Sequence, residues 1–214
     1  MSRVVHLLSF VSAASAFMAA VPAATPRQVA LKESLLEGLE GATPPMGLWD
    51  PLGLAEIGSE KTIAWYRQAE IKHGRVAMFA TVGWIVNELG IHFPGNIATG
   101  VPFASLGKGV DAWIAVPDAG KAQMIAFVGL LELGIETEKP HYMMGGKLGY
   151  CPGPARYGKL FDPNDFVYKS NDEAALAKLR NKELNNGRLA MIAVMGFFAA
   201  SYIDGSVPLL PPTW

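Results

Sequence analysis

The sequence predicts an all-α membrane protein of three transmembrane helices, in which the first and third helices are copies that cross each other. Three observations support this fold class: a low content of charged residues, three long apolar helical segments, and a repeat that covers two of them. Only 17% of the 214 residues are charged, whereas about a quarter is typical of soluble domains. With a net charge of −1, the chain offers no basic face to a phosphate backbone, which argues against nucleic-acid binding.

Residues 1–30 are expected to be a targeting segment that is processed, which leaves residues 31–214 as a single three-helix domain. Arg3 opens a short basic region, an apolar stretch follows, and Ala14-Ser15-Ala16 resembles a small-residue cleavage site. A disordered or membrane-dipping N-terminus is the alternative. The apolar stretch is too short, and too often interrupted by serine, to span a bilayer.

Three helical segments follow, at about residues 61–90, 118–136 and 172–203. The uninterrupted apolar runs of the first and third segments are only 11 and 12 residues long, and about 18 are needed to identify a span from hydropathy alone. The Gly- and Pro-rich stretches between the helices, residues 93–116 and 140–165, are expected to be loops.

The distribution of basic residues favours three spans over three core helices. Residues 139–182 contain eight Lys and Arg, residues 91–118 contain one, and residues 189–214 contain none. Loops on one side of a membrane collect Lys and Arg. Three spans would place the N-terminus and the second connection on that basic side, with the C-terminus opposite.

An internal repeat relates the first and third helices. Glu70–Gly83 aligns without gaps on Glu183–Gly196, and seven of the fourteen positions are identical at an offset of 113. Upstream, Trp49-Asp50-Pro51 matches Phe161-Asp162-Pro163 at an offset of 112. Related copies within one membrane chain most simply pack about a pseudo-two-fold axis.

The charged residues of the repeat predict two ion pairs between its copies. Glu70 and Arg75 are five residues apart, and favourable pairs within one helix need a spacing of three or four. If the two helices cross, Glu70 can meet Arg188 while Glu183 meets Arg75. An unpaired Arg at membrane depth costs about 3 kcal/mol. Surface charges on a soluble helix, the alternative, would leave the duplication unexplained.

Each copy also carries a neutral donor three residues after its Glu, His73 in the first and Asn186 in the third helix. Single donors of this kind suit a metal that is already held by a macrocycle and needs one axial ligand. A magnesium porphyrin fits, because Mg²⁺ accepts carboxylate, amide oxygen or imidazole. The alternative for His73 is a histidine of the core whose hydrogen bonds are satisfied.

Glu-x-x-His-x-Arg at residues 70–75 and Glu-x-x-Asn-x-Arg at residues 183–188 resemble the signature of the chlorophyll-binding light-harvesting antenna family. Trp49–Leu54 resembles that family's approach to the first helix, and the resemblance covers roughly residues 44–210. The loop that begins at His141 and the sequence Ala14-Ser-Ala-Phe17 are similar to the chlorophyll a/c antennas, of fucoxanthin or peridinin type, of algae with complex plastids.

The resemblance implies a role for each matching residue. The magnesium of chlorophyll would be ligated by Glu70, His73, Gln123, Glu132, Glu183 and Asn186, and two of the glutamates would be neutralised by Arg75 and Arg188. The ends of two crossed carotenoids would be held by Trp49, Asp50, Phe161 and Asp162. The residues after Pro163 depart from the Leu-Gly of the family. As plain polar residues, the two donors of the middle helix would have no obvious partner.

The family usually has a Gln or similar ligand fourteen residues after the Asn of the third helix, where this chain has Ala200. No side chain of this chain is therefore expected to ligate a chlorophyll there. The adjacent Ser201 points about 100° away around the helix, and its hydroxyl is short.

The resemblance further implies chlorophyll a, chlorophyll c and carotenoids, namely xanthophylls such as fucoxanthin or peridinin. It implies a plastid thylakoid location, a stromal N-terminus and second connection, and a lumenal C-terminus. The partners would be a photosystem core (I or II), neighbouring antenna subunits and thylakoid lipids. No catalytic constellation is visible, so an enzyme is not expected. The alternatives to an antenna are a photoprotective, quenching member of the family and a small membrane transporter.

Overall fold

The computed structural model describes residues 36, 40–137, 139–146, 173–203 and 205–208. The chain divides into two compact units, Met1–Ile63 and Ala64–Trp214. The expected targeting segment lies outside the described residues, and so do Phe161 and Asp162 of the second predicted carotenoid turn.

In the first unit a tight turn leads into the short helix α3, Leu54–Ile57. Asp50 caps this helix, since its carboxylate oxygens accept hydrogen bonds from the backbone N–H groups of Leu54 and Ala55 at 3.1 and 2.8 Å. Gly53 precedes the helix with a φ of 62°, a left-handed conformation that glycine adopts without strain. The sequence Asp-Pro-Leu-Gly thus makes a compact helix start in which Asp50 is fixed.

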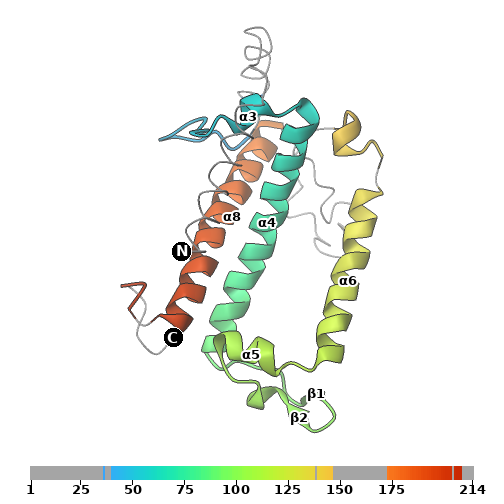
Figure 1. The fold of residues 1–214 in the computed structure, drawn as a ribbon, viewed down its shortest axis with the longest axis vertical. Coiled ribbons are helices and arrows are strands. Elements are labelled where there is room, and N and C mark those ends of the chain that lie inside the picture. Colours follow the sequence, from blue (N-terminus) through green and yellow to red (C-terminus); the bar gives the residue numbers. More distant parts are fainter. Residues whose placement is uncertain (1–35, 37–39, 138, 147–172, 204, 209–214) are drawn as a thin grey trace, which may run out of the picture. The chain divides into compact units, whose positions relative to one another are not determined.

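The second unit contains most of α4 and all of α6 and α8, the three long helices (Figure 1). Their bounds are Glu60–Glu88, Asp118–Glu136 and Glu173–Tyr202. Each bound lies within two residues of the one expected from the sequence.

The expectation of a plain loop at residues 93–116 is wrong. Two antiparallel strands, β1 (Asn96–Ala98) and β2 (Val101–Pro102), form a short hairpin, and a 3-10 turn leads on to helix α5 (Gly109–Ala115). Figure 1 shows these elements together at the end of α4. The amide oxygen of Asn87, on the last turn of α4, accepts a hydrogen bond from the Gly109 N–H at 2.8 Å. Short strands between glycines give too little periodicity to be recognised in the sequence.

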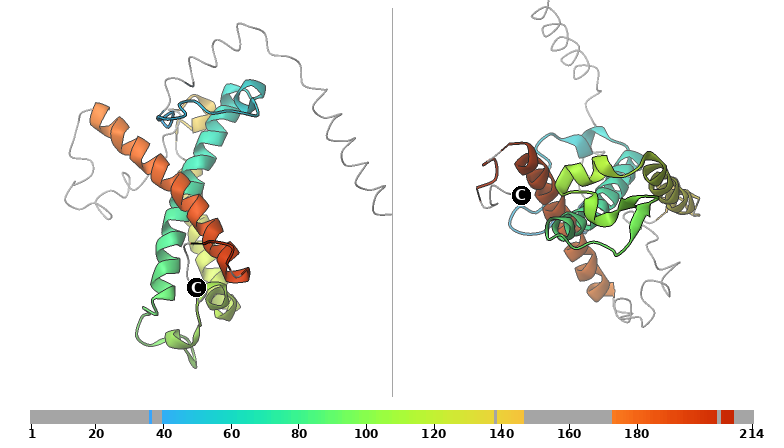
Figure 2. Two further views of the ribbon diagram at one scale, coloured as in Figure 1. Left: turned by 90° about the vertical axis from the view of Figure 1, so that its left-hand side faces the viewer. Right: turned by 90° about the horizontal axis from the view of Figure 1, so that it is seen from below.

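Helices α4 and α8 cross in the second unit (Figure 2). At the crossing Gly74 faces Gly187, and a Cβ added to Gly187 would lie 2.9 Å from the Cα of Gly74. Beside the glycines the buried Ile71 and Leu184 form a small apolar cluster. Both pairs consist of equivalent positions of the repeat, at the offset of 113. The repeat therefore supplies small residues where the backbones approach and apolar residues beside them.

Helix α6 has a stretch with no buried face. Every residue from 122 to 130 is exposed, which is about two and a half turns of helix. The large apolar side chains among them are Met124, Ile125, Phe127, Val128 and Leu130. Among the described residues, no helix alone has both the length and the apolar composition of a membrane span. Helix α5 and residues 118–133 of α6 reach that length and composition only together, and the chain bends by 100° between them.

Candidate functional site

Two ion pairs join α4 to α8 at their crossing. Arg188 donates from Nε to Oε1 of Glu70 at 2.7 Å, and its Nη2 lies 2.7 Å from the same oxygen. Arg75 donates from Nε to Oε1 of Glu183 at 2.6 Å. These are the two contacts that the repeat predicts. Bonds of this type, in which both groups are charged, are about twice as strong as neutral ones, so they fix the register of the crossing.

Glu70 has a second basic partner, which the family motif does not predict. Arg67, one turn earlier on α4, donates from Nη1 to Oε2 of Glu70 at 3.0 Å and is only 8% exposed. Both oxygens of Glu70 thus face a guanidinium, whereas Arg75 is the single ion-pair partner of Glu183 among the described residues. The sequence does hold a signal for Arg67, because Arg67 and Arg180 are also separated by 113 residues.

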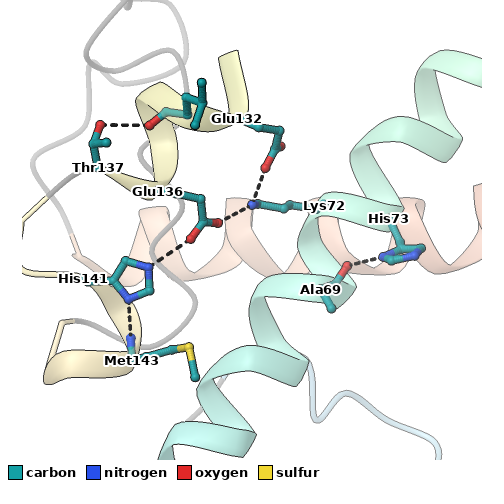
Figure 3. Close-up of polar contacts among 9 residues, drawn as sticks. Ala69, Lys72, His73, Glu132, Glu136, Thr137, His141 and Met143 are labelled. Carbon is teal, nitrogen blue, oxygen red and sulfur yellow. Dashed lines mark hydrogen bonds and ion pairs between the residues drawn. The ribbon is translucent and has the colours of Figure 1, made fainter. Parts of the chain in front are cut away.

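His73 lies on the exposed side of α4, with one ring nitrogen engaged (Figure 3). Its Nδ1 is 2.8 Å from the backbone oxygen of Ala69. A carbonyl oxygen only accepts hydrogen bonds, so Nδ1 carries the hydrogen, and Nε2 of the neutral ring keeps its lone pair. The equivalent residue of α8, Asn186, is also exposed. Both donors of the repeat are therefore accessible, and His73 is in a tautomer that can ligate a metal.

The two predicted donors of α6 have different surroundings. Gln123 lies in the exposed stretch of the helix. Glu132 accepts a hydrogen bond at Oε2 from Nζ of Lys72 at 2.5 Å, and Lys72 also donates to Oε1 of Glu136 at 2.7 Å (Figure 3). The expectation that Glu132 would have no partner is wrong, because its partner comes from a different helix, 60 residues away in the chain.

The polar network continues from Glu136 into the segment after α6. Met143 donates its backbone N–H to Nδ1 of His141 at 3.2 Å. In the neutral ring Nε2 then carries the hydrogen, and it lies 2.9 Å from Oε2 of Glu136. Tyr142, in the 3-10 turn Tyr142–Met144, stacks on the His141 ring with centroids 4.2 Å apart. Burial and the Glu136 carboxylate raise the pKa of Tyr142 above its usual value.

The structure describes one of the two predicted carotenoid turns. Asp50 is held by its two bonds to the start of α3, and the neighbouring Trp49 is 66% exposed. A rigid turn beside an exposed aromatic side chain is suited to a flat or elongated apolar ligand. Phe161 and Asp162 of the other turn lie outside the described residues.

The donor set fits a metal that arrives within a macrocycle. In the described ranges of the chain, no three His, Cys, Asp or Glu side chains are grouped as a free metal ion would require. The candidates are instead single donors on three helices: carboxylates with counter-charges, an imidazole, and amides. Mg²⁺ accepts each of these types, and one of them is enough where a porphyrin ring supplies the other four ligands.

Comparisons with known proteins agree with this chemistry. A family model described as chlorophyll A-B binding protein matches residues 35–202. The chain is 38% identical over 174 residues to the fucoxanthin-chlorophyll a-c binding protein, chloroplastic, of Trieres chinensis, covering 79% of this chain and 81% of the relative. It is 36% identical over 203 residues to the corresponding protein F of Phaeodactylum tricornutum, covering 92% and 96% of the two chains. It is 32% identical over 183 residues to protein B of Macrocystis pyrifera, covering 85% and 79%.

Proposed function

This chain belongs to the chlorophyll A-B binding protein family, and on that premise we propose which of its residues hold the pigments. The chain is a light-harvesting antenna protein, not an enzyme: it binds pigments that absorb light and pass on the excitation energy. Its pigments are chlorophyll a, chlorophyll c and the carotenoid fucoxanthin, as the names of its relatives indicate.

The observation that carries this function is the exposure of apolar side chains along the helices. Residues 122–130 of α6 are all exposed, and Phe79 of α4 is 82% and Ile192 of α8 is 72% exposed. Each such side chain forgoes about 1.5–3 kcal/mol of hydrophobic stabilisation when it stays in water. Flat pigments between the helices, and lipid around them, supply the missing apolar contacts.

The proposed ligands lie where the structure makes a donor accessible and balances its charge. Glu70 and Glu183 would each ligate one chlorophyll, and Arg188 and Arg75 would neutralise them. The neutral ligands would be His73, Asn186 and Gln123, and Glu132 would serve a site on α6. Bound chlorophyll supplies a magnesium with an open axial position and the light-absorbing ring; the protein fixes the position and orientation of each ring.

The proposed carotenoid sites use the two turns that precede the repeated helices. The Asp50 turn with Trp49 would hold one end of the first carotenoid, and the capped start of α3 makes that turn rigid. Phe161 and Asp162 would hold the second, by the likeness of the two turns in sequence.

We place α4, α6 and α8 across the thylakoid membrane of the plastid, with α4 and α8 related by a pseudo-two-fold axis. The Glu–Arg pairs support this placement, because pairing reduces the cost of charged groups at membrane depth. The basic residues between 139 and 182 put that connection and the N-terminus on the stromal side, and the C-terminus on the lumenal side. The partners would be a photosystem core, neighbouring antenna subunits and thylakoid lipids.

Pigment analysis of the full-length protein, purified from thylakoids in mild detergent, tests the function. We expect chlorophyll a, chlorophyll c and fucoxanthin in fixed ratios to the polypeptide. Excitation of fucoxanthin should give chlorophyll a fluorescence with a long lifetime. A colourless protein would contradict the antenna function and favour a transporter, and a pigmented protein with a short lifetime would favour photoprotective quenching.

A further inference from the structure

Lys72 carries a charge that the repeat does not explain. It occupies a variable position of Glu-x-x-His-x-Arg, and its equivalent in the second copy is Asn185. Its side chain reaches from α4 to α6, where Nζ donates to Oε2 of Glu132 and Oε1 of Glu136 at 2.5 and 2.7 Å (Figure 3). Lys72 is about a quarter exposed, so the ammonium group is directed into the protein and not simply solvated.

Glu132 needs a counter-charge that α6 itself does not provide. Its neighbours at three and four residues are Val128, Gly129, Ile135 and Glu136. The last of these is a second carboxylate, and like charges four apart destabilise a helix. The ammonium group of Lys72 supplies this counter-charge and also reduces the repulsion between Glu132 and Glu136, because it lies within hydrogen-bond distance of both carboxylates.

We propose that Lys72 is the positioning residue of the chlorophyll site on α6. There it neutralises Glu132, as the arginines neutralise Glu70 and Glu183. The inference rests on the proposed ligand role of Glu132. Lys72 donates a hydrogen bond to Oε2 of Glu132, and among the described residues no hydrogen bond engages Oε1 of Glu132. The Glu132 side chain is 43% exposed, so it is accessible to a ligand while its charge is neutralised.

Glu136 and His141 hold Lys72 from the other side. Glu136 accepts from Lys72 at Oε1, and its Oε2 lies 2.9 Å from Nε2 of His141. His141 is in turn fixed by the backbone N–H of Met143. The chain of bonds from Met143 to Lys72 orients the ammonium group beside Glu132 without using the second oxygen of Glu132.

The test is reconstitution of the full chain with chlorophyll a, chlorophyll c and fucoxanthin, followed by measurement of chlorophyll per polypeptide and of the absorption difference spectrum. Lys72→Met should lose one chlorophyll, with the same difference spectrum as Glu132→Ala. Lys72→Arg should retain it, because a guanidinium also neutralises a carboxylate. Lys61→Met, on the same helix and exposed, is the control and should lose none.

A second variant separates neutralisation from simple tethering of the helices. Glu132→Gln offers an amide oxygen and no charge, so it should keep the chlorophyll, and adding Lys72→Met to it should then remove nothing. Equal losses from Lys72→Met in both backgrounds, or failure of the double variant to assemble, would overturn the inference. So would a full chlorophyll complement in Lys72→Met alone. A wild-type chain that takes up no pigment would overturn the proposed function as well, whereas these other outcomes leave it standing.

Discussion

Gly74 of α4 and Gly187 of α8 pack backbone against backbone. A Cβ on Gly187 would lie 2.9 Å from the Cα of Gly74, and a Cβ on Gly74 would lie 3.1 Å from the Cα of Gly187. Both distances are shorter than ordinary van der Waals contact between carbon atoms. The Glu–Arg pairs flank this contact, since Gly74 precedes Arg75 and Gly187 precedes Arg188. The separation of the helices at the glycines therefore sets whether each guanidinium reaches its carboxylate.

Gly187→Ala should destabilise the protein even though alanine favours helices. The methyl group meets backbone atoms of Gly74, which cannot move aside, and overpacking of this kind costs about 1–3 kcal/mol. The gain in helix propensity, about 1 kcal/mol, offsets only part of that. We expect a lower midpoint in thermal unfolding followed by circular dichroism.

Gly83→Ala provides the matched control on α4. A Cβ at Gly83 meets no atom within 4 Å, so the helix-propensity gain should appear without a clash, and the midpoint should stay or rise. Equal shifts for Gly83→Ala and Gly187→Ala would show that the close approach at the crossing has no energetic consequence.

Arg75→Leu should be more damaging than Arg188→Leu. Loss of Arg75 removes the single ion-pair partner that Glu183 has among the described residues, and an unpaired charge at membrane depth costs about 3 kcal/mol. Loss of Arg188 leaves Glu70 with its bond to Arg67 at 3.0 Å. Thermal stability and yield of the reconstituted pigment complex should fall in the order wild type, Arg188→Leu, Arg75→Leu.

Lysine at either position should restore stability only in part, because it lacks the planar fork of arginine. The double variant Arg67→Leu/Arg188→Leu should fall to the level of Arg75→Leu. Identical behaviour of the two single arginine variants would contradict a stabilising role for Arg67.

The sequence predicts contacts wherever they follow from the repeat. The pairs of Glu70 with Arg188 and of Glu183 with Arg75 come from residues that recur at an offset of 113. Such pairs can be foreseen because, where two like helices cross, a contact from the first helix to the second recurs from the second to the first. The positions of the three long helices follow instead from their apolar stretches. The bond of Arg67 to Glu70 follows from a different signal, because the two residues are three apart on one helix.

Contacts that depend on the distance between unlike helices are not predictable in this way. No period or motif relates Lys72 to Glu132, which is 60 residues away. The bond exists because a long flexible side chain happens to bridge α4 and α6. The hairpin at residues 96–102 and helix α5 are likewise short elements whose form is decided by tertiary contacts, such as the bond between Asn87 and Gly109.

His73→Asn should keep the chlorophyll that His73→Leu loses. The repeat places Asn186 at the equivalent position of α8, and an amide oxygen is an acceptable magnesium ligand. His73 is exposed and its ring makes a hydrogen bond only with the backbone of its own helix among the described residues, so neither change should disturb the packing of the protein. Pigment content per polypeptide after reconstitution is the measurement. Equal chlorophyll in the Asn and Leu variants would rule out His73 as a ligand.

Ala200→Gln should add a chlorophyll near the end of α8. Ala200 is fourteen residues after Asn186, about 21 Å along the helix, where the family that the chain belongs to usually has a ligand. Ser201 is no substitute, because its hydroxyl lies 2.9 and 3.1 Å from the backbone oxygens of Phe197 and Phe198. A hydroxyl turned back to its own helix in this way is not directed at a ligand.

The comparison with Ala200→Leu separates the effect of the amide oxygen, which can ligate magnesium, from the effect of a larger side chain. Glutamine and leucine are of similar size, and Ala200 is half-buried, so both variants should disturb the packing to a similar degree. The glutamine variant should gain one chlorophyll per polypeptide and a new component in the absorption difference spectrum, and the leucine variant should gain neither. If the two variants had the same pigment content, the position would be filled by a pigment held from elsewhere or closed by packing. Direct ligation of magnesium by Ser201 in the wild-type protein would contradict this prediction.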